Sequence, residues 1–126
     1  MIVLDTSVLI DGLTGSRRSA PAIRSTLAEG EQIRLTALVL YEWLRGPRLP
    51  QELAAQEALF PARSAIPFGH DEAILSADLY RAVTRPRGRE IDLGIAACAI
   101  LREAQLWTLN RADFRDMPGL RLYGPR

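Results

Sequence analysis

The sequence predicts an α/β fold in which helices cover a mainly parallel sheet. Short apolar runs typical of strands alternate along the chain with longer segments bounded by residues that begin or end helices. This alternation is typical of βα units, whose successive strands lie parallel in one sheet. The chain has 126 residues, 48% of them hydrophobic and 25% charged, which fits one globular domain over residues 1–126.

The first elements are marked by residues suited to the ends of strands and helices. Met1 to Leu4 is apolar and predicts a buried strand. The side chains of Asp5-Thr6-Ser7 are suited to capping a helix that continues to about Leu13. A second helix begins at Ser19-Ala20-Pro21 and should end at Gly30, because proline favours a helix start and glycine a helix end.

The next segment predicts one strand and two helices. Gln32 to Leu35 is a short apolar run typical of a strand. Thr36 caps a helix over residues 37–45, which Gly46-Pro47 ends. Leu49-Pro50 then opens a helix that continues to residue 60.

The second half of the chain predicts three more strands and two more helices. Ala65 to Pro67 predicts an edge strand, where proline is tolerated. His70-Asp71 begins a helix that runs to about Thr84, and a basic turn follows at residues 85–89. The remaining elements are a helix at 91–104 and strands at 106–109 and 120–123.

The composition excludes several classes of enzyme. All 16 basic residues are arginine, so the chain lacks the lysine of a phosphate-binding P-loop, of Schiff-base chemistry, and of phosphoacceptor and haloacid-dehalogenase-like domains. A single histidine excludes a two-histidine ribonuclease mechanism and the usual histidine-rich zinc site. A single cysteine excludes an intrachain disulfide and favours a reducing, cytoplasmic location.

Charge is distributed unevenly, and no membrane segment is expected. The formal net charge is +1, but residues 1–80 carry 7 arginines against 10 acids, whereas residues 81–126 carry 9 arginines against 5 acids. This asymmetry is a weak indication of an anionic partner. The apolar N-terminal run stops at Asp5, which is too early for a signal peptide. The run from Ile91 to Leu101 is too short to span a bilayer.

Four carboxylates are candidates for a functional site. Asp5 ends the first strand, where parallel α/β sheets bind ligands, although it is equally suited to capping the next helix. Glu42 lies in a nearly all-apolar helix, so it needs donors or a cation, at a functional site or in an ion pair with Arg45. Asp92 lies in the most apolar helix, where it can also complement the helix dipole. Asp113 follows a strand and can alternatively cap a turn.

If these acids share one site, their repulsion favours a bound cation. Two like charges about 4 Å apart repel by roughly 4 kcal/mol at an effective dielectric constant near 20. Converging carboxylates therefore raise one another's pKa or bind a hard cation. Oxygen ligands without histidine or cysteine favour Mg²⁺ or Mn²⁺ over zinc. The chemistry expected of such a site is metal-assisted hydrolysis of a phosphodiester.

These segments, taken in order, resemble the PIN-domain ribonucleases. The matching segments are Val3-Leu4-Asp5-Thr6-Ser7-Val8-Leu9-Ile10, Glu42 in its apolar helix, Asp92-Leu93-Gly94-Ile95-Ala96-Ala97, and Thr108-Leu109-Asn110-Arg111-Ala112-Asp113-Phe114. Their order and spacing match the family, and the resemblance covers essentially the whole chain. The chain length and the closing Thr-x-Asn-x-x-Asp-Phe are similar to the VapC toxins of type II toxin–antitoxin pairs.

The resemblance implies a fold, an activity and partners. The implied fold is a three-layer sandwich with five strands in the order 3-2-1-4-5, in which strands 1 and 4 are neighbours. The implied activity is Mg²⁺-dependent cleavage of RNA, usually transfer RNA, with Mn²⁺ as a possible substitute. The implied partners are a second copy of the chain in a homodimer and a small cognate antitoxin that inhibits the nuclease.

The resemblance also implies roles for individual residues. Asp5 and Asp92 match the family's principal metal ligands, and Glu42 matches its third acid. Ser7 matches a hydroxyl that supports the site. Near Thr108, the position two residues further on is often acidic in the family but is Asn110 here. Either Asn110 or Asp113, three residues beyond it, therefore occupies the fourth position.

The resulting hypothesis is a metal-dependent nuclease site with an arginine-bearing exterior. Asp5, Glu42, Asp92 and Asp113 are predicted to bind the metal and act in catalysis, and the predicted supporting residues are Ser7, Thr108 and Asn110. Setting the four acids aside leaves 16 arginines against 11 acids. Candidates for contacts to RNA phosphates are Arg85, Arg87 and Arg89, which alternatively form only a solvated loop.

Two other functions and several structural roles stay open. The chain is alternatively a PIN nuclease of RNA processing without an antitoxin, or a non-catalytic PIN module that binds RNA. His70 is expected at a helix start, and Cys98 is expected to pack in a buried helix. Trp43 and Trp107 are expected in the core, with base stacking as the alternative role.

Overall fold

A computed structural model describes residues 1–124 and confirms an α/β fold with a parallel sheet. The strands are β1 (Ile2–Leu4), β2 (Ile33–Arg34), β3 (Gln105–Trp107) and β4 (Arg121–Leu122). The α-helices are α1 (Thr6–Leu13), α2 (Ala20–Ala28), α3 (Ala37–Arg45), α4 (Pro50–Leu59), α5 (His70–Ala82) and α6 (Glu90–Leu101). Two short 3-10 helices are η1 (Ala62–Ser64) and η2 (Arg111–Asp113).

The strands are ordered β2-β1-β3-β4, and each pair of neighbours is parallel. Leu4 at the end of β1 is level with Trp107 at the end of β3. The residues that follow these two strands therefore leave the same edge of the sheet side by side. This is the edge at which parallel α/β sheets bind ligands.

The expectation of five strands is wrong by one, because the segment 65–67 forms no strand. The described sheet has four strands, and this segment contributes only an isolated parallel bridge between Ile66 and Thr36. This bridge has two hydrogen bonds: the Ile66 amide donates to the Leu35 carbonyl, and the Ala37 amide donates to the Ile66 carbonyl. The partner segment enters α3 at Ala37, so it offers no extended backbone for a further rung and the pairing stops. The expected order of the other four strands is observed.

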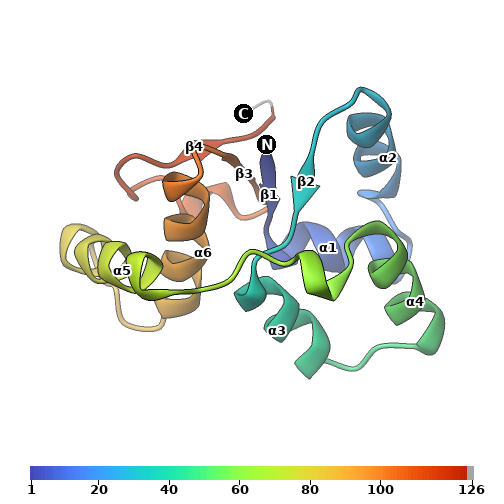
Figure 1. The fold of residues 1–126 in the computed structure, drawn as a ribbon, viewed down its shortest axis with the longest axis horizontal. Helices are drawn as coiled ribbons and strands as arrows, with labels where there is room; N and C mark the ends of the chain where they lie inside the picture. The colour runs from blue at the N-terminus through green and yellow to red at the C-terminus, as the bar shows by residue number, and fades with distance from the viewer. Residues whose placement is uncertain (125–126) are drawn as a thin grey trace.

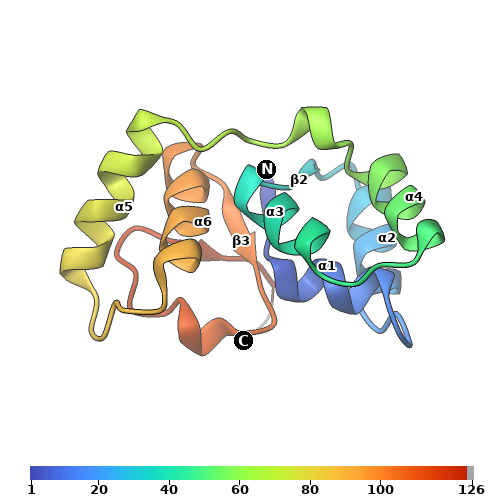
Figure 2. The same ribbon diagram turned by 90° about the horizontal axis from the view of Figure 1, so that it is seen from below.

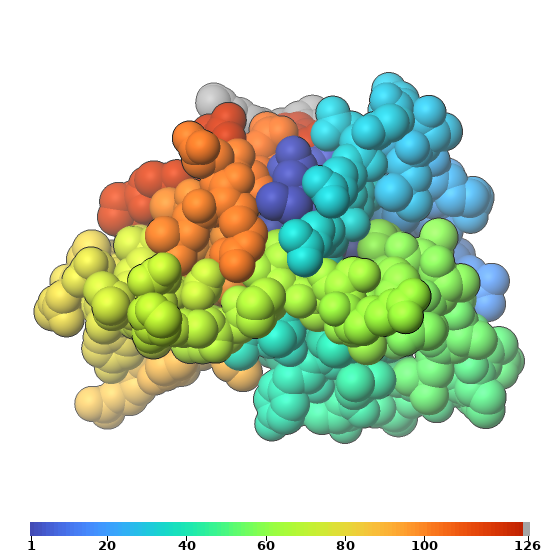
Figure 3. Space-filling model, in the orientation of Figure 1, coloured from blue at the N-terminus to red at the C-terminus, as the bar shows by residue number. Residues whose placement is uncertain are grey.

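The helices gather at the two ends of the molecule. Figures 1 and 2 show α5 and α6 at one end and α2 and α4 at the other, with the strands between them. The connection between α4 and α5 crosses the front of the molecule as a continuous band of atoms in Figure 3. Helices α1 and α3 start beyond the carboxyl ends of β1 and β2 (Figure 1), so their first turns lie beside the ligand-binding edge of the sheet.

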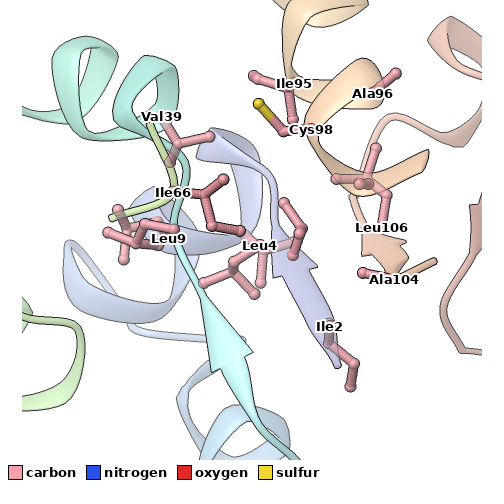
Figure 4. Packing of buried hydrophobic residues seen from close by; sticks show 14 of the residues in the cluster. Ile2, Leu4, Leu9, Val39, Ile66, Ile95, Ala96, Cys98, Ala104 and Leu106 are labelled. Atoms are coloured by element: carbon pink, nitrogen blue, oxygen red, sulfur yellow. The ribbon is translucent and has the colours of Figure 1, made fainter. Parts of the chain in front are cut away.

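The hydrophobic core lies between the sheet and these helices. Figure 4 shows side chains from β1, α1, α3, α6 and β3 pointing toward one another. The fully buried members include Ile2, Leu4, Leu9, Val39, Ile66, Ile95 and Leu106. Seven consecutive residues of α6, from Leu93 to Ala99, are buried, so the helix is enclosed on nearly every side. Among residues 1–124, no helix has the length and apolar character needed to cross a bilayer.

Local signals place several helix ends where they were expected. The Thr36 hydroxyl accepts a hydrogen bond from the Val39 amide at 3.1 Å and so caps α3, which ends before Gly46. In α4 the Glu52 carboxylate accepts from the Leu49 amide at 2.8 Å. Helix α6 ends at Leu101, three residues before the expected end. The next turn contains Glu103 at a φ of 53°, a left-handed conformation that a helix does not continue through.

Candidate active site

Asp5 lies at the centre of the candidate site, directly after β1. It is 4% exposed, and its backbone amide donates to the Trp107 carbonyl at 2.8 Å across the sheet. The hydroxyls of Ser7 and Thr108 both donate to Oδ2 of Asp5, each at 2.8 Å. The side chain makes no capping hydrogen bond to α1, so capping does not account for this buried carboxylate. Within residues 1–124, Oδ1 accepts no hydrogen bond and is left for another ligand.

The supporting hydroxyls are themselves fixed by the loop after β3. Ser7 Oγ accepts a hydrogen bond from the Leu109 amide at 3.1 Å. Thr108 Oγ1 accepts from the Asn110 amide at 2.9 Å. Because each hydroxyl accepts a backbone N–H, its proton is directed toward Asp5. Asn110 thus contributes its main chain to this network, and its exposed side chain contributes nothing to it.

Glu42 approaches the site from the second turn of α3. Its Oε1 accepts a hydrogen bond from the Thr6 hydroxyl at 2.6 Å, and its Oε2 lies 3.5 Å from Arg45. The ion pair expected as an alternative role is therefore present, but Arg45 is about half exposed and the pair is screened by water. The sequence predicted only a helix-capping role for Thr6, shared with Asp5 and Ser7, and no role at the site. Thr6 orients Glu42 from the turn that also carries Asp5.

Asp92 lies in the first turn of α6, and its pKa is raised by burial and by the neighbouring acids. Burial is the largest cause that raises the pKa of Asp92, to about 6. Repulsion from Asp5, then Glu42, then Asp113 raises it further, and the nearby Arg89 opposes these effects. The four predicted acids come from the end of β1, from α3, from α6 and from η2, and the other three lie close enough for their charges to act on the Asp92 carboxyl group.

Asp113 reaches the site through a loop that Arg89 clamps to the start of α6. Arg89 donates to both carboxylate oxygens of Asp116, at 2.6 and 3.0 Å, and to the main-chain oxygens of Asp113 and Thr84, at 2.8 and 2.7 Å. The bidentate pair raises the pKa of Arg89 and lowers the pKa of Asp116. Helix α6 and the η2 loop are therefore joined beside Asp92 and Asp113.

The three candidate arginines of the basic turn are in different environments. Arg85 and Arg87 are exposed, and Arg85 borders a cavity of about 580 Å³ that also contacts Asp113. Arg89 directs four of its donors at protein atoms, which leaves one N–H of the guanidinium. Contacts to RNA phosphate stay a prediction for Arg85 and Arg87, and the geometry of Arg89 favours a positioning role.

Comparison with known proteins places these residues in a family. The model of the PIN domain matches residues 2–120 of the chain. The chain belongs to the PIN domain family. The match includes the four acids and the three supporting residues, from Asp5 to Asp113.

Relatives of this PIN domain include a ribonuclease and components of toxin–antitoxin complexes. Ribonuclease VapC19 of Mycobacterium tuberculosis is 35% identical over 122 residues, which cover 95% of this chain and 97% of the relative. The structure of VapBC2 from Rickettsia felis, bound to a DNA fragment from its promoter, matches with a TM-score of 0.74 at 21% identity over 100% of both chains. A toxin–antitoxin complex from Klebsiella pneumoniae matches with a TM-score of 0.70 at 27% identity over 95% of both chains.

The donor set of this PIN domain fits a hard divalent cation in its chemistry. All candidate ligands are carboxylate oxygens, Oδ1 of Asp5 accepts no hydrogen bond within residues 1–124, and the charges of Asp5, Glu42 and Asp113 repel that of Asp92. Among residues 1–124, no three acids, histidines or cysteines are arranged to hold a metal by themselves. Mg²⁺ usually takes one or two carboxylates and keeps several waters, so it needs no cage made only of protein.

The other residues discussed from the sequence lie outside the acid cluster. His70 is exposed at the start of α5, and Trp43 is fully buried in the core. Burial raises the pKa of Cys98 to about 11, so its thiol stays protonated and packs as an apolar group. Trp107 is only half-buried, in contrast to its expected place in the core, and it lines a surface cavity next to Thr108.

Proposed function

We propose that this PIN domain is an endoribonuclease that depends on Mg²⁺ or Mn²⁺. The observation that carries the proposal is the buried carboxylate of Asp5 at the carboxyl end of β1, held by two hydroxyls, with the charges of Asp5, Glu42 and Asp113 all acting on Asp92. The 35% sequence identity to a ribonuclease, over 95% of this chain, supports the same reaction. Transfer RNA is the substrate class that we propose, and a single domain over residues 1–126 carries the activity.

Asp5 and Asp92 are the proposed principal metal ligands, and Glu42 and Asp113 complete the acidic site. A bound Mg²⁺ supplies an activated water for attack on the phosphodiester and neutralises the charge that develops on it. The chain's own part is orientation: Ser7 and Thr108 fix Asp5 so that one oxygen is free, and Thr6 fixes Glu42. These hydrogen bonds fix the orientation of the Asp5 and Glu42 carboxylates before the substrate binds.

We further propose that the nuclease is the toxin of a toxin–antitoxin pair. Its similarity to toxin–antitoxin complexes supports an antitoxin partner, and a homodimer in the cytoplasm is the proposed state of the toxin. Expression of the chain alone should arrest growth, and coexpression of the product of an adjacent short reading frame should restore it. Cleavage without growth arrest would favour a PIN nuclease of RNA processing.

Cleavage of transfer RNA by the purified protein tests the proposed reaction. We expect cleavage with Mg²⁺ or Mn²⁺, none with excess chelator, and a loss of at least about 100-fold in Asp5→Ala and Asp92→Asn. Asp71→Asn is a matched control, because Asp71 is an exposed acid in the first turn of α5 and should leave cleavage unchanged. Wild-type rates in both site variants would refute the metal site. RNA binding without any cleavage would favour the non-catalytic module.

A further inference from the structure

Two adjacent surface cavities on the β4 side of the acidic site share two lining residues. One is about 420 Å³ and the other about 660 Å³, and both are lined by Arg111 and Gly124. We call their union the C-terminal groove. The residues that give it its chemistry are Trp107, Thr108, Leu109, Arg111, Arg115 and Tyr123.

The groove begins at the acidic site. Thr108 lines the groove and donates its hydroxyl proton to Asp5. The amide of the next residue, Leu109, donates to Ser7, and the Leu109 side chain is 52% exposed. A chain lying in the groove would therefore contact the two residues that hold Asp5 and Ser7 in place.

The aromatic side chains of the groove present flat surfaces. The ring centroids of Trp107 and Tyr123 are 5.0 Å apart, and their planes are tilted by 50°. The Tyr123 hydroxyl lies 3.1 Å from that of Thr26 in α2, which fixes the orientation of the ring. Both aromatic residues are half-buried: they pack against the hydrophobic core and also line the groove. Such platforms stack nucleic-acid bases of any sequence.

The charge of the groove is opposite to that of the site it adjoins. Among the described residues that line the two cavities, two are arginines and none is an acid. Within residues 1–124, Arg111 uses one donor on the Tyr123 carbonyl at 3.0 Å and directs none of its other four N–H groups at a protein acceptor, and Arg115 is exposed. A polymer with a phosphate at every unit complements this arrangement, since Arg111 and Arg115 can contact phosphates that neighbour the one at the acidic site.

We propose that the C-terminal groove binds the single-stranded RNA segment that flanks the cleaved phosphate. One base stacks on Trp107, and Arg111 contacts a phosphate. This inference rests on the proposed nuclease function, and it adds a binding subsite that the acids do not provide. A peptide of the antitoxin is the competing occupant. It is disfavoured because the paired rings and the surplus of arginine donors match a nucleotide better than an apolar side chain.

Binding of a fluorescent single-stranded RNA in chelator, measured by anisotropy, tests the groove without any cleavage. We expect Trp107→Ala to weaken binding about 5- to 100-fold, and Trp107→Phe to retain most of it. Arg111→Ala should lower the slope of log affinity against log salt by about 0.7. The control Arg63→Ala removes one exposed arginine outside the groove and should change affinity far less. Circular dichroism verifies that each variant folds.

Photocrosslinking of the wild-type chain to RNA that contains 5-iodouridine provides a test without substitutions. We expect the crosslinked peptide to contain Trp107 or Tyr123. Crosslinks elsewhere, or unchanged RNA affinity in Trp107→Ala, would overturn the proposal. Loss of antitoxin binding with unchanged RNA affinity would overturn it in favour of the peptide. If the wild type crosslinks at the groove but never cleaves RNA, the proposed nuclease activity is refuted, whereas the proposed RNA binding in the groove is supported.

Discussion

Individual side chains of the acidic site are held in states that favour ligand binding over stability. Asp5 is buried with one oxygen satisfied by two hydroxyls and the other free. Asp92 has a pKa of about 6 because it is buried and surrounded by other acids. Since its ordinary pKa is 3.8, ionisation of Asp92 opposes folding whenever no cation is bound. Such a cost is common where function requires charges to converge.

Asp92→Asn should therefore stabilise the metal-free protein while it abolishes cleavage. Because the folded-state pKa lies above the unfolded one, the destabilisation is full above about pH 6, fades as the pH falls toward 3.8, and is absent below that. At pH 7.5 we expect the free energy of unfolding to rise by on the order of 1–3 kcal/mol. Urea denaturation in chelator at pH 7.5 and pH 3.5 measures this. A variant that is less stable than wild type at pH 7.5 contradicts it.

At the scale of elements, the site depends on the junction between α6 and the η2 loop. Arg89 precedes α6, and Asp113 and Asp116 belong to the chain segment after β3, so the clamp joins two segments that carry different acids. The Arg89 side chain is 20% exposed and that of Asp116 is 37% exposed. The pair is thus partly shielded from water, and its bidentate geometry is the arrangement in which a surface ion pair contributes most.

Arg89→Ala should loosen this junction and impair catalysis from outside the acid cluster. We expect about 10- to 100-fold lower activity at limiting Mg²⁺. The expected loss of stability is about 1–2 kcal/mol after allowance for solvent screening. Arg89→Lys should restore part of both, because it keeps the charge but not the bidentate fork.

The pH dependence of the Arg89 clamp has the sign usual for a stabilised carboxylate. The pKa of Asp116 is lowered from its ordinary 3.8, so the ion pair contributes stability above pH 3.8 and loses it as the pH falls further. The stability gap between wild type and Arg89→Ala should accordingly close in acid. An equal gap at pH 7 and pH 2.5, measured by denaturation, would show that the ion pair is not its source.

For the whole molecule, the acidic site connects both halves of the chain. Asp5 and Glu42 lie in the N-terminal half, and Asp92 and Asp113 lie in the C-terminal half. Helices α2 and α4 of the N-terminal half and helices α5 and α6 of the C-terminal half lie at opposite ends of the molecule, and the strands of both halves meet in the central sheet. A cation at this junction binds only the folded chain, because the unfolded chain has no reason to bring these acids together.

Mn²⁺ should therefore raise the stability of the entire molecule in one cooperative transition. At a free Mn²⁺ concentration 100 times its Kd, we expect a gain of about 2.7 kcal/mol in the free energy of unfolding. Calorimetry with and without chelator measures the shift, and Asp92→Asn should show little of it. Equal shifts in the wild type and in this variant would mean that the cation binds elsewhere.

The sequence by itself determined the features that depend on neighbouring residues. Helix α3 occupies 37–45 because a threonine caps its first turn and Gly46-Pro47 ends it. The acid candidates were found because Asp5, Glu42 and Asp92 interrupt apolar segments, and burying an unpaired charge is costly. These signals act over a few residues, and they are readable wherever they occur.

Only the tertiary structure decided which distant residues meet. Thr6 contacts Glu42 from 36 residues away, and Arg89 contacts Asp116 from 27 residues away. No local pattern distinguishes Arg89 from the other arginines of its turn, since the difference arises when η2 packs against α6. The same holds for Trp107, whose position beside the acidic site follows from strand register. Long-range pairing selects among side chains that local chemistry leaves equivalent.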